Sequence, residues 1–187
     1  MTDLTQFEEV AAPAAEPAAG AAPEAPALLT ITARGVPGPQ GSKNHVGGGR
    51  MIESSAKVKP WRDSVAWRAI EARSKVRGWR PLVGPVALSM TFTFTRPKSH
   101  YGSGRNADRV LPSAPPRPDV KPDLDKIVRA TKDALTTAQI YRDDAQVVEF
   151  RRPFGKWYST DHGLLPDVLD TPGCVIRVWF LGKEVDR

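Results

Sequence analysis

Every second side chain between residues 84 and 96 is a large hydrophobic one, and Thr or Ser fills most of the positions between them. This alternation predicts a β-strand that is buried on one face. Shorter runs that contain β-branched residues predict further strands at 28–36, at about 145–152 and at 173–182. The pattern therefore predicts a sheet of about four strands.

Two other segments have the spacing of amphipathic helices. From residue 60 onward, one face carries four apolar side chains: Trp61, Val65, Ala69 and Ala72. A second helix is predicted at 123–137. Its buried face would carry five side chains with helical spacing: Leu124, Ile127, Val128, Thr131 and Leu135. The resulting order, β-α-β-α-β-β, predicts a single small α/β (α+β) domain with a mixed sheet and two main helices.

Three segments show neither the alternation of a strand nor the spacing of an amphipathic helix. Residues 37–51 are Gly-rich and basic, 97–120 are dense in Gly, Pro and basic residues, and 153–172 are irregular. A loop as long as 97–120 inside a compact domain is usually functional or mobile. The cations in the two basic loops are therefore candidates for contacts with phosphate groups.

The first 27 residues consist mainly of Ala and Pro, contain five acidic residues and lack Lys and Arg. Few of their side chains are large and apolar, so burial cannot offset the entropy lost on ordering. We expect a disordered tail at 1–27 and a folded domain at 28–187. The segment has neither the basic start and apolar stretch of a secretory signal nor the arginines of an organelle-targeting segment.

The tail changes the charge of the part that is expected to fold. The full chain has 27 basic and 21 acidic residues, a formal charge of +6. Residues 28–187 keep all 27 basic side chains and 16 of the acidic ones, so their formal charge is +11. Such an excess favours a polyanionic partner, most simply nucleic acid. The alternative is a solvated basic surface that keeps the protein soluble.

Cysteine content and hydropathy limit the protein class further. The single cysteine, Cys174, lies in an apolar run and is expected to be buried. One cysteine excludes a disulfide framework and a cysteine-based zinc finger, and it is typical of the reducing cytoplasm. There is no run of about 18 apolar residues. The sequence therefore predicts a cytoplasmic protein that does not cross a membrane.

Two acidic pairs stand out in this basic domain. Asp123 and Asp125 lie at the start of the second helix, and Asp143 and Asp144 lie just before the next strand. Cleavage of a phosphodiester is helped by a hard cation that polarises the phosphoryl oxygen and generates hydroxide. Mg²⁺ binds through a few carboxylates and water. A short turn after the helix can bring the second pair back beside the first, so the acids are candidate metal ligands.

Each acid also has a purely structural interpretation. Asp123 could cap the helix, Asp125 could complement its dipole, and an Asp-Asp pair is common in polar turns. Arg129 and Lys132 share a helix face with Asp125. A cation there could hold the scissile phosphate or stabilise its developing charge. The alternative is an exposed salt bridge between residues four apart.

Three sequence runs together resemble the RusA family of Holliday junction resolvases. They are Pro-Asp-Leu-Asp-Lys-Ile-Val-Arg-Ala at 122–130, Asp-Ala-Leu at 133–135 and Tyr-Arg-Asp-Asp-Ala-Gln-Val-Val at 141–148. The family pattern is Asp-Leu-Asp-Asn with a Lys one turn later, then Asp-Ala-Leu, then Asp-Asp-Ala-Gln-Val-Val. The likeness covers about residues 29–152 and is most specific at 118–149. The polar loop at 37–44 also resembles the loop after the first strand of these proteins.

The resemblance implies a homodimeric, Mg²⁺-dependent α/β nuclease that resolves four-way junctions by paired nicks, with Mn²⁺ as a substitute ion. Its metal ligands would be Asp123, Asp125 and Asp144. The catalytic Lys of the family falls at Arg129, which keeps the charge but cannot donate a proton near neutral pH. The Asn after the second Asp is Lys126 here.

The expected partner is branched DNA, in the cytoplasm of a bacterial or phage-infected cell. The candidate DNA contacts are Lys43, Arg50, Lys126 and Lys132. Trp157 and Tyr158 could stack on unpaired bases at a junction, or they could pack in the core or at an interface. Two other functions stay open: a non-catalytic DNA-binding or replication-accessory protein on the same fold, and a nuclease that cuts linear duplex.

Overall fold

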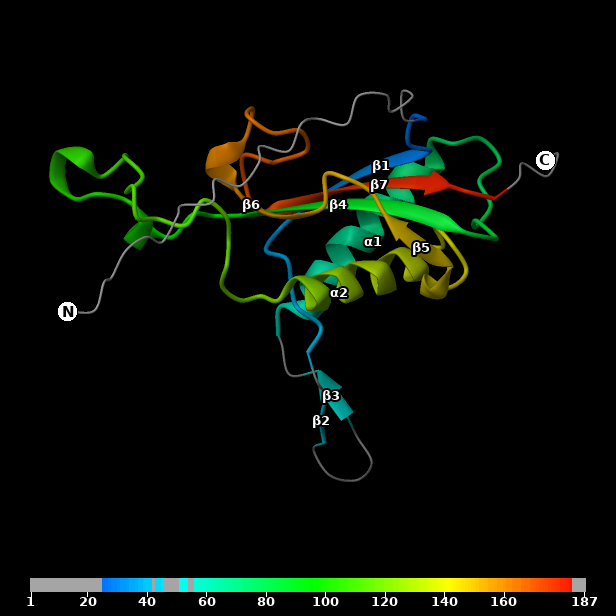
Figure 1. Cartoon of the computed structure of the whole chain (residues 1–187). Helices are drawn as coiled ribbons and strands as arrows, with labels where there is room; N and C mark the ends of the chain where they lie inside the picture. The colour runs from blue at the N-terminus through cyan, green and yellow to red at the C-terminus, as the bar shows by residue number, and fades with distance from the viewer. Residues whose placement is uncertain (1–24, 42, 46–50, 54–55, 183–187) are drawn as a thin grey trace, which may run out of the picture.

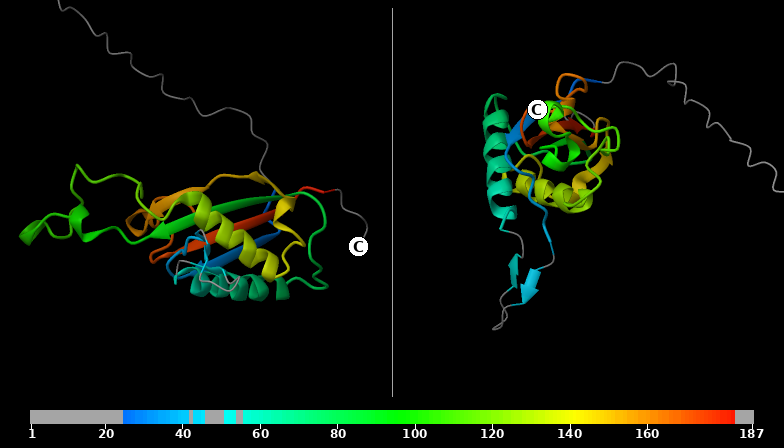
Figure 2. Two further views of the ribbon diagram at one scale, coloured as in Figure 1. Left: turned by 90° about the horizontal axis from the view of Figure 1, so that it is seen from below. Right: turned by 90° about the vertical axis from the view of Figure 1, so that its left-hand side faces the viewer.

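A five-stranded sheet and two helices form two layers, which confirms the predicted α/β class (Figure 1). A computed structural model describes residues 25–41, 43–45, 51–53 and 56–182. Both helices lie on the same face of the sheet (Figure 2). One continuous hydrophobic core fills the space between the layers, so the described part of the chain is a single small domain.

The sheet order is β1-β7-β4-β5, with strand bounds Leu29–Arg34 for β1, Gly173–Phe180 for β7, Val86–Phe94 for β4 and Val147–Phe150 for β5. β7 pairs antiparallel with both β1 and β4. β5 pairs parallel with the start of β4. The sheet is therefore mixed, as predicted, and β4 lies inside it.

The fifth strand, β6 (Gly155–Tyr158), lies in the segment that was expected to be irregular. It pairs parallel with the end of β4, from Thr91 to Phe94. The expectation was wrong because four residues are too few to show alternation. Residues 37–51 were also expected to be a loop, but β2 (Lys43–His45) and β3 (Met51–Glu53) pair as an antiparallel hairpin. That hairpin forms in a polar segment, so hydropathy gave no sign of it.

The two helices are α1 (Val58–Ser74) and α2 (Leu124–Thr137), close to the predicted segments. Both bury the predicted faces, and the Trp61 indole donates a hydrogen bond of 3.1 Å to the Thr131 hydroxyl between them. That hydroxyl donates in turn to the Ile127 carbonyl. The buried polar groups at the helix contact are therefore paired.

β4 is buried on both faces, which corrects the expectation of one exposed face. Ser89, Thr91 and Thr93 are fully buried on the side away from the helices. The segment that precedes β7 covers this side, since the backbone N–H of Leu169 donates to the Thr93 hydroxyl. Alternating Thr residues resemble a solvent-facing side, but here they lie under a covering loop.

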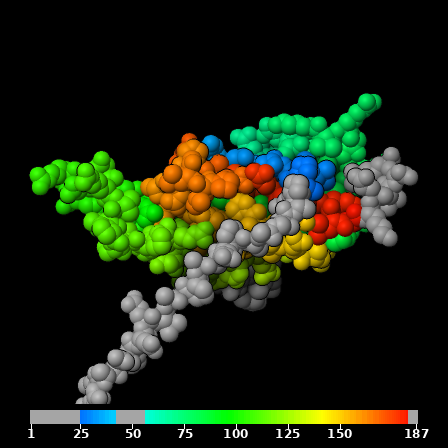
Figure 3. Space-filling view, turned by 45° about the horizontal axis from the view of Figure 1, so that its top comes forward, coloured from blue at the N-terminus to red at the C-terminus, as the bar shows by residue number. Residues whose placement is uncertain are grey.

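Two projections leave the end of the domain where α1 and α2 begin (Figure 1). The β2–β3 hairpin is one of them. The other is residues 98–117, which we call the finger, and it extends well beyond the body of the protein (Figure 3). The finger contains the short helices η1 (Lys98–His100) and η2 (Gly104–Asn106). Backbone hydrogen bonds from Gly102 to Arg109 and from Leu111 to His100 hold its two sides together.

The described chain begins at Ala25, whose carbonyl accepts a 2.8 Å hydrogen bond from the Trp179 indole. Residues 1–24, most of the expected tail, lie outside the described residues. Cys174 is fully buried and unpaired, as expected. Among the described residues, no helix is long and apolar enough to cross a membrane.

Candidate active site at the start of α2

Asp123 occupies the N-cap position of α2, but its side chain does not cap the helix. Its carboxylate instead lies 2.6 Å from the Lys126 ammonium. The hydrogen bond from Lys126, with weaker attraction from Lys121 and Lys156, holds the pKa of Asp123 below its ordinary value. The capping interpretation of Asp123 is therefore wrong, and the carboxylate is ionised beside a cation.

Asp125 and Arg129 lie one turn apart on the exposed side of α2. Neither forms a salt bridge or a side-chain hydrogen bond within the part of the chain that the structure describes. The alternative of an Asp125–Arg129 salt bridge is therefore not observed. An unpaired carboxylate beside an unpaired guanidinium leaves both groups available to a ligand.

Asp143 and Asp144 have different roles although they are adjacent. Asp143 caps the short helix η3 (Asp144–Gln146), because its carboxylate accepts from the Ala145 N–H at 2.8 Å. The Gln146 side-chain oxygen accepts a hydrogen bond from the Asp143 N–H, and its amide nitrogen donates to the carbonyls of Leu82 and Gly84. The polar-turn interpretation thus holds for Asp143 and leaves the Asp144 carboxylate free of capping.

The Asp144 carboxylate points to α2, where it lies 3.3 Å from the Lys132 ammonium. Tyr141 fixes the chain between α2 and η3, since its buried hydroxyl donates a 3.0 Å hydrogen bond to the Lys132 carbonyl. Burial, together with the nearby Asp144 carboxylate, raises the pKa of Tyr141 well above its ordinary value. The phenol therefore stays protonated and acts as a structural donor.

The structure brings Asp144 to the middle of α2 rather than to its start. Lys132 is seven residues after Asp125, about 10 Å along the helix axis. No group of three His, Cys, Asp or Glu side chains that could hold a metal ion forms among the described residues. The three predicted carboxylates thus lie along one side of α2, with a lysine beside Asp123 and another beside Asp144.

Gln40 is a site residue that sequence reasoning missed. Its backbone N–H donates a 3.1 Å hydrogen bond to the Lys126 carbonyl, so the loop after β1 packs against the first turn of α2. Gly38 lets the same loop pass close to the start of α1, because a Cβ there would lie 2.2 Å from the Lys57 carbonyl oxygen. The Gln40 side-chain oxygen is buried and lacks a hydrogen-bond partner among the described residues. The likeness of this loop to the family was the available signal.

Lys156 was also missed. It lies in β6, far from α2 in sequence, and its ammonium donates to the carbonyls of Val120 at 2.8 Å and Pro122 at 3.1 Å. These bonds fix the chain segment that leads directly into Asp123. Only the unexpected strand β6 places this charge near the site, so no local sequence signal could identify it.

The predicted DNA contacts are distributed around this site. Lys126 and Lys132 flank the acids, as described above. Lys43 is the first residue of β2, whereas Arg50 lies outside the described residues. Trp157 is 6% exposed and the Arg117 guanidinium lies 4.2 Å from its ring centre, which favours packing over stacking on a base. In the finger, Lys98, Arg105 and Arg109 form no ion pair within the described structure, and Arg117 contacts the Trp157 ring.

Comparison with known proteins agrees with the motifs. The family described as Endodeoxyribonuclease RusA matches residues 34–164, which contain both helices and all three predicted carboxylates. Uncharacterized protein YqaN of Bacillus subtilis (strain 168) is 35% identical over 80 residues, which are 43% of this chain and 54% of that protein. The chain thus spans about half the length of this curated relative. It belongs to the RusA family of endodeoxyribonucleases.

Proposed function

We propose that this protein is a metal-dependent endonuclease that resolves Holliday junctions and related branched DNA by paired nicks, in DNA recombination and repair. The observation that carries the proposal is the exposed side of α2. There Asp125 and Arg129 are unpaired, Asp123 does not cap its helix, and Asp144 approaches from the following turn. A structural role explains Asp143 but none of these four residues.

The donor set fits a hard divalent cation. Asp123 and Asp125 supply the carboxylate oxygens that Mg²⁺ prefers, and the Lys126 ammonium already occupies a cation position 2.6 Å from Asp123. Asp144, which lies beside Lys132 at the middle of α2, would have to move toward the start of the helix to be the third ligand. Bound Mg²⁺ would polarise the phosphoryl oxygen and lower the pKa of its water. Mn²⁺ can substitute because it also takes carboxylate and water ligands.

The chain's own cations would position the phosphate. Arg129 would bind a non-bridging oxygen and stabilise the charge that develops on it, because its five donors match phosphate geometry. It cannot protonate the leaving oxygen near neutral pH. Lys132 keeps Asp144 oriented toward α2 in the free protein. A substrate phosphate would compete with Asp144 for Lys132, which would release the Asp144 carboxylate oxygens to the metal.

Preference for branched DNA would come from the two projections and from a homodimer. The hairpin and the finger extend from the end of the domain that holds Asp123 (Figure 1). They could therefore contact two arms of a junction beside one site. A homodimer would carry two such sites, one for each strand that must be nicked. The site of action would be the cytoplasm of a bacterial or phage-infected cell.

A second function is favoured by one observation. Lysines lie beside Asp123 and Asp144, and the family's Asn and Lys are replaced by Lys126 and Arg129. A non-catalytic DNA-binding or replication-accessory protein would tolerate these changes, because internal ion pairs would replace the metal. If this second function is correct, the protein binds a four-way junction but does not nick it at any metal concentration.

The deciding experiment is cleavage of a synthetic four-way junction beside a linear duplex of the same sequence, with Mg²⁺, with Mn²⁺ and with EDTA. The proposal expects metal-dependent symmetric nicks in the junction only. Junction binding without nicks supports the accessory function, and equal cleavage of the linear duplex supports a duplex nuclease. The Asp125→Asn variant, purified in parallel, excludes a contaminating nuclease.

A further inference from the structure

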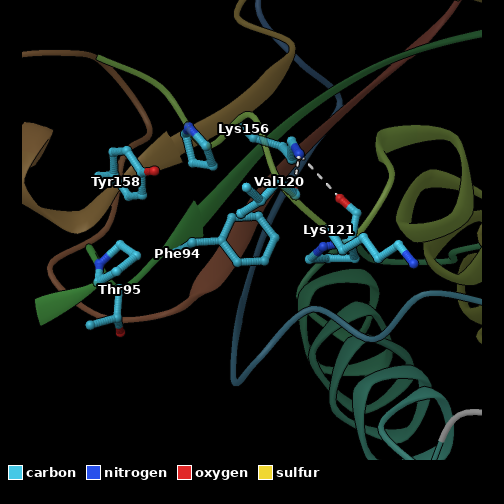
Figure 4. A pocket seen from close by; sticks show the side chains of 9 residues that line it. Phe94, Thr95, Val120, Lys121, Lys156 and Tyr158 are labelled. Carbon is cyan, nitrogen blue, oxygen red and sulfur yellow. Dashed lines mark hydrogen bonds between the residues drawn. The ribbon is translucent and has the colours of Figure 1, made fainter. Parts of the chain in front are cut away.

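A small pocket lies directly beside the start of α2 (Figure 4). Its walls come from the end of β4, from β6 and from the segment that leads into α2. The walls are mainly apolar, and the important ones are Phe94, Val120, Pro122 and Tyr158. Since Pro122 immediately precedes Asp123, the pocket adjoins the candidate active site.

The pocket has the size of one aromatic ring. Its volume is about 140 Å³, close to the roughly 150 Å³ of an apolar protein cavity that holds one benzene molecule. A pyrimidine ring would therefore fit, whereas a larger ligand would extend into solvent. Both Phe94 and Tyr158 line the pocket (Figure 4), and the partly exposed Phe94 ring is a surface on which a base could stack.

Neighbouring side chains hold the Tyr158 wall in place. The Arg96 guanidinium lies 4.0 Å from the centre of the Tyr158 ring, and the His100 ring meets it edge-on. Arg96 is buried and donates to the Thr160 hydroxyl and the Pro115 carbonyl. The ring is thus fixed before any ligand arrives, as a binding site requires.

The hydroxyl of Tyr158 points from this wall toward Phe94 and Val120 (Figure 4). It is buried and has no hydrogen-bond partner among the described residues. A buried hydroxyl without a partner loses the hydrogen bonds that it would make in water. A polar edge of a base in the pocket would supply the missing partner.

Charge links the pocket to the adjacent phosphate. Lys121 and Lys156 line the pocket; Lys121 precedes Asp123 by two residues, and Lys156 bonds to the carbonyl of Pro122, the residue directly before Asp123. Lys156 uses two ammonium protons on the carbonyls of Val120 and Pro122. Its third donor is free for a phosphate oxygen. A nucleotide could therefore place its base in the pocket while its phosphate lies near Asp123.

We propose that this pocket binds one unstacked base of the DNA strand, next to the phosphate that is cut. The proposal rests on the proposed function and adds the contact that selects the strand position. Bases at the exchange point of a junction are less constrained than in a duplex, so one can leave its stack at lower cost. The site would thereby recognise branched DNA by a base as well as by its backbone.

The test combines pocket-filling variants with junctions that lack a single base. Thr95→Trp and Val120→Trp place a ring in the pocket from two different walls. Val83→Trp adds the same side chain at an exposed position near the opposite end of β4 and serves as the control. Each protein is titrated with intact junctions and with junctions that carry one abasic site near the exchange point, in Ca²⁺ to prevent cleavage.

For one strand position, removal of the base should weaken binding by the wild type and by Val83→Trp about 5- to 100-fold, the range for one stacked base. The same abasic site should change binding by the two filled variants less than twofold. The proposal is overturned if no abasic position discriminates the filled variants from the wild type. It is also overturned if the filled variants bind the intact junction as tightly as the wild type does.

This readout is separate from the proposed catalysis, because binding is measured without cleavage. Coupling between base and pocket without nicks in Mg²⁺ would contradict the nuclease function and support the pocket. Normal nicks without coupling would support the nuclease function and contradict the base-binding pocket.

Tyr158→Phe keeps the ring and removes the hydroxyl, so it should reduce discrimination among the four bases at the sensitive position. Unchanged discrimination would refute the role of the hydroxyl.

Discussion

The Lys132 ammonium lies 3.3 Å from the Asp144 carboxylate and joins the middle of α2 to the turn before β5. This ion pair neutralises the carboxylate that completes the proposed metal site. For the three carboxylates to act together, this contact must break and Asp144 must move toward the start of α2. Because both side chains are partly exposed, this contact contributes little to folding and can be exchanged for a ligand.

Asp144→Asn should lower the nicking rate at least about 100-fold, the order seen for loss of one preorganised charged or polar group. DNA binding should stay equal or become tighter, because a negative charge near phosphate is removed. Asp123→Asn and Asp125→Asn should behave in the same way. Single-turnover cleavage and a separate binding titration measure the two effects.

Asp143→Asn is the matched control for this set. Asn caps a helix about as well as Asp, so the turn should keep its shape and cleavage should stay within about twofold of the wild type. A normal rate for Asp144→Asn would show that the site is assigned wrongly. Equal loss in the Asp143 variant would indicate that the turn, rather than the Asp144 carboxylate, is essential.

Arg129→Ala should lower the single-turnover cleavage rate by roughly 10²- to 10³-fold, because it removes a donor to the developing charge. Arg129→Lys should keep or raise the rate, since the charge remains. Binding should weaken far less than the rate, because one phosphate contact is a small part of the affinity. Arg68→Ala, on the exposed side of α1, is the control. If Arg129→Ala cuts at the wild-type rate, Lys132 and Lys126 become the candidates.

Lys126→Asn restores the family residue and should lower the Mg²⁺ concentration needed for half-maximal cleavage several-fold. The substitution removes the ammonium that competes with the metal for Asp123. It should also raise the pKa of Asp123 toward its ordinary value. Because the ionised carboxylate is required, the acidic limb of the pH–rate profile should move to higher pH.

Lys75→Asn is the control, because it removes an equivalent exposed partner of Glu71 on α1. It should change neither the Mg²⁺ requirement nor the acidic limb of the pH–rate profile. A higher Mg²⁺ requirement in the Lys126 variant would contradict competition between the ammonium and the metal. It would assign Lys126 to DNA binding instead, and a weaker affinity for the junction would accompany it.

Deletion of residues 1–24 should leave the melting temperature and cleavage unchanged. Deletion of 1–27 should lower the melting temperature by about 2–4 °C, because it removes the Ala25 carbonyl that pairs with Trp179. One such hydrogen bond contributes about 1 kcal/mol, which gives this shift in a domain of this size. Calorimetry of both truncated proteins measures the difference. Identical melting temperatures would place the domain boundary after Ala27.

The sequence was sufficient to predict the long elements, because their patterns are strong. The stripe on α2 and the alternation of β4 identified both elements within a few residues. Burial of Thr91 and Thr93 could not be predicted, since it depends on a covering loop from elsewhere in the chain. β6 could not be predicted either, because only pairing with β4 makes its four residues a strand.

The candidate site divides in the same way. Motif spacing identified Asp123, Asp125 and Asp144, but their partners required coordinates. The contrast between Asp143 as a cap and Asp144 as a free carboxylate depends on the direction of the chain at η3. Lys156 approaches from a separate strand, so only the fold places it beside Asp123.

The two hydrogen bonds of the Lys156 ammonium have a consequence for variation of this protein. They attach residues 120–122 to the sheet, so the position of Asp123 is set by β6 and not by the chain that precedes it. Insertions or deletions in the finger would be absorbed before this attachment. We therefore expect the finger to change length and sequence between homologues while the spacing of the carboxylates is kept.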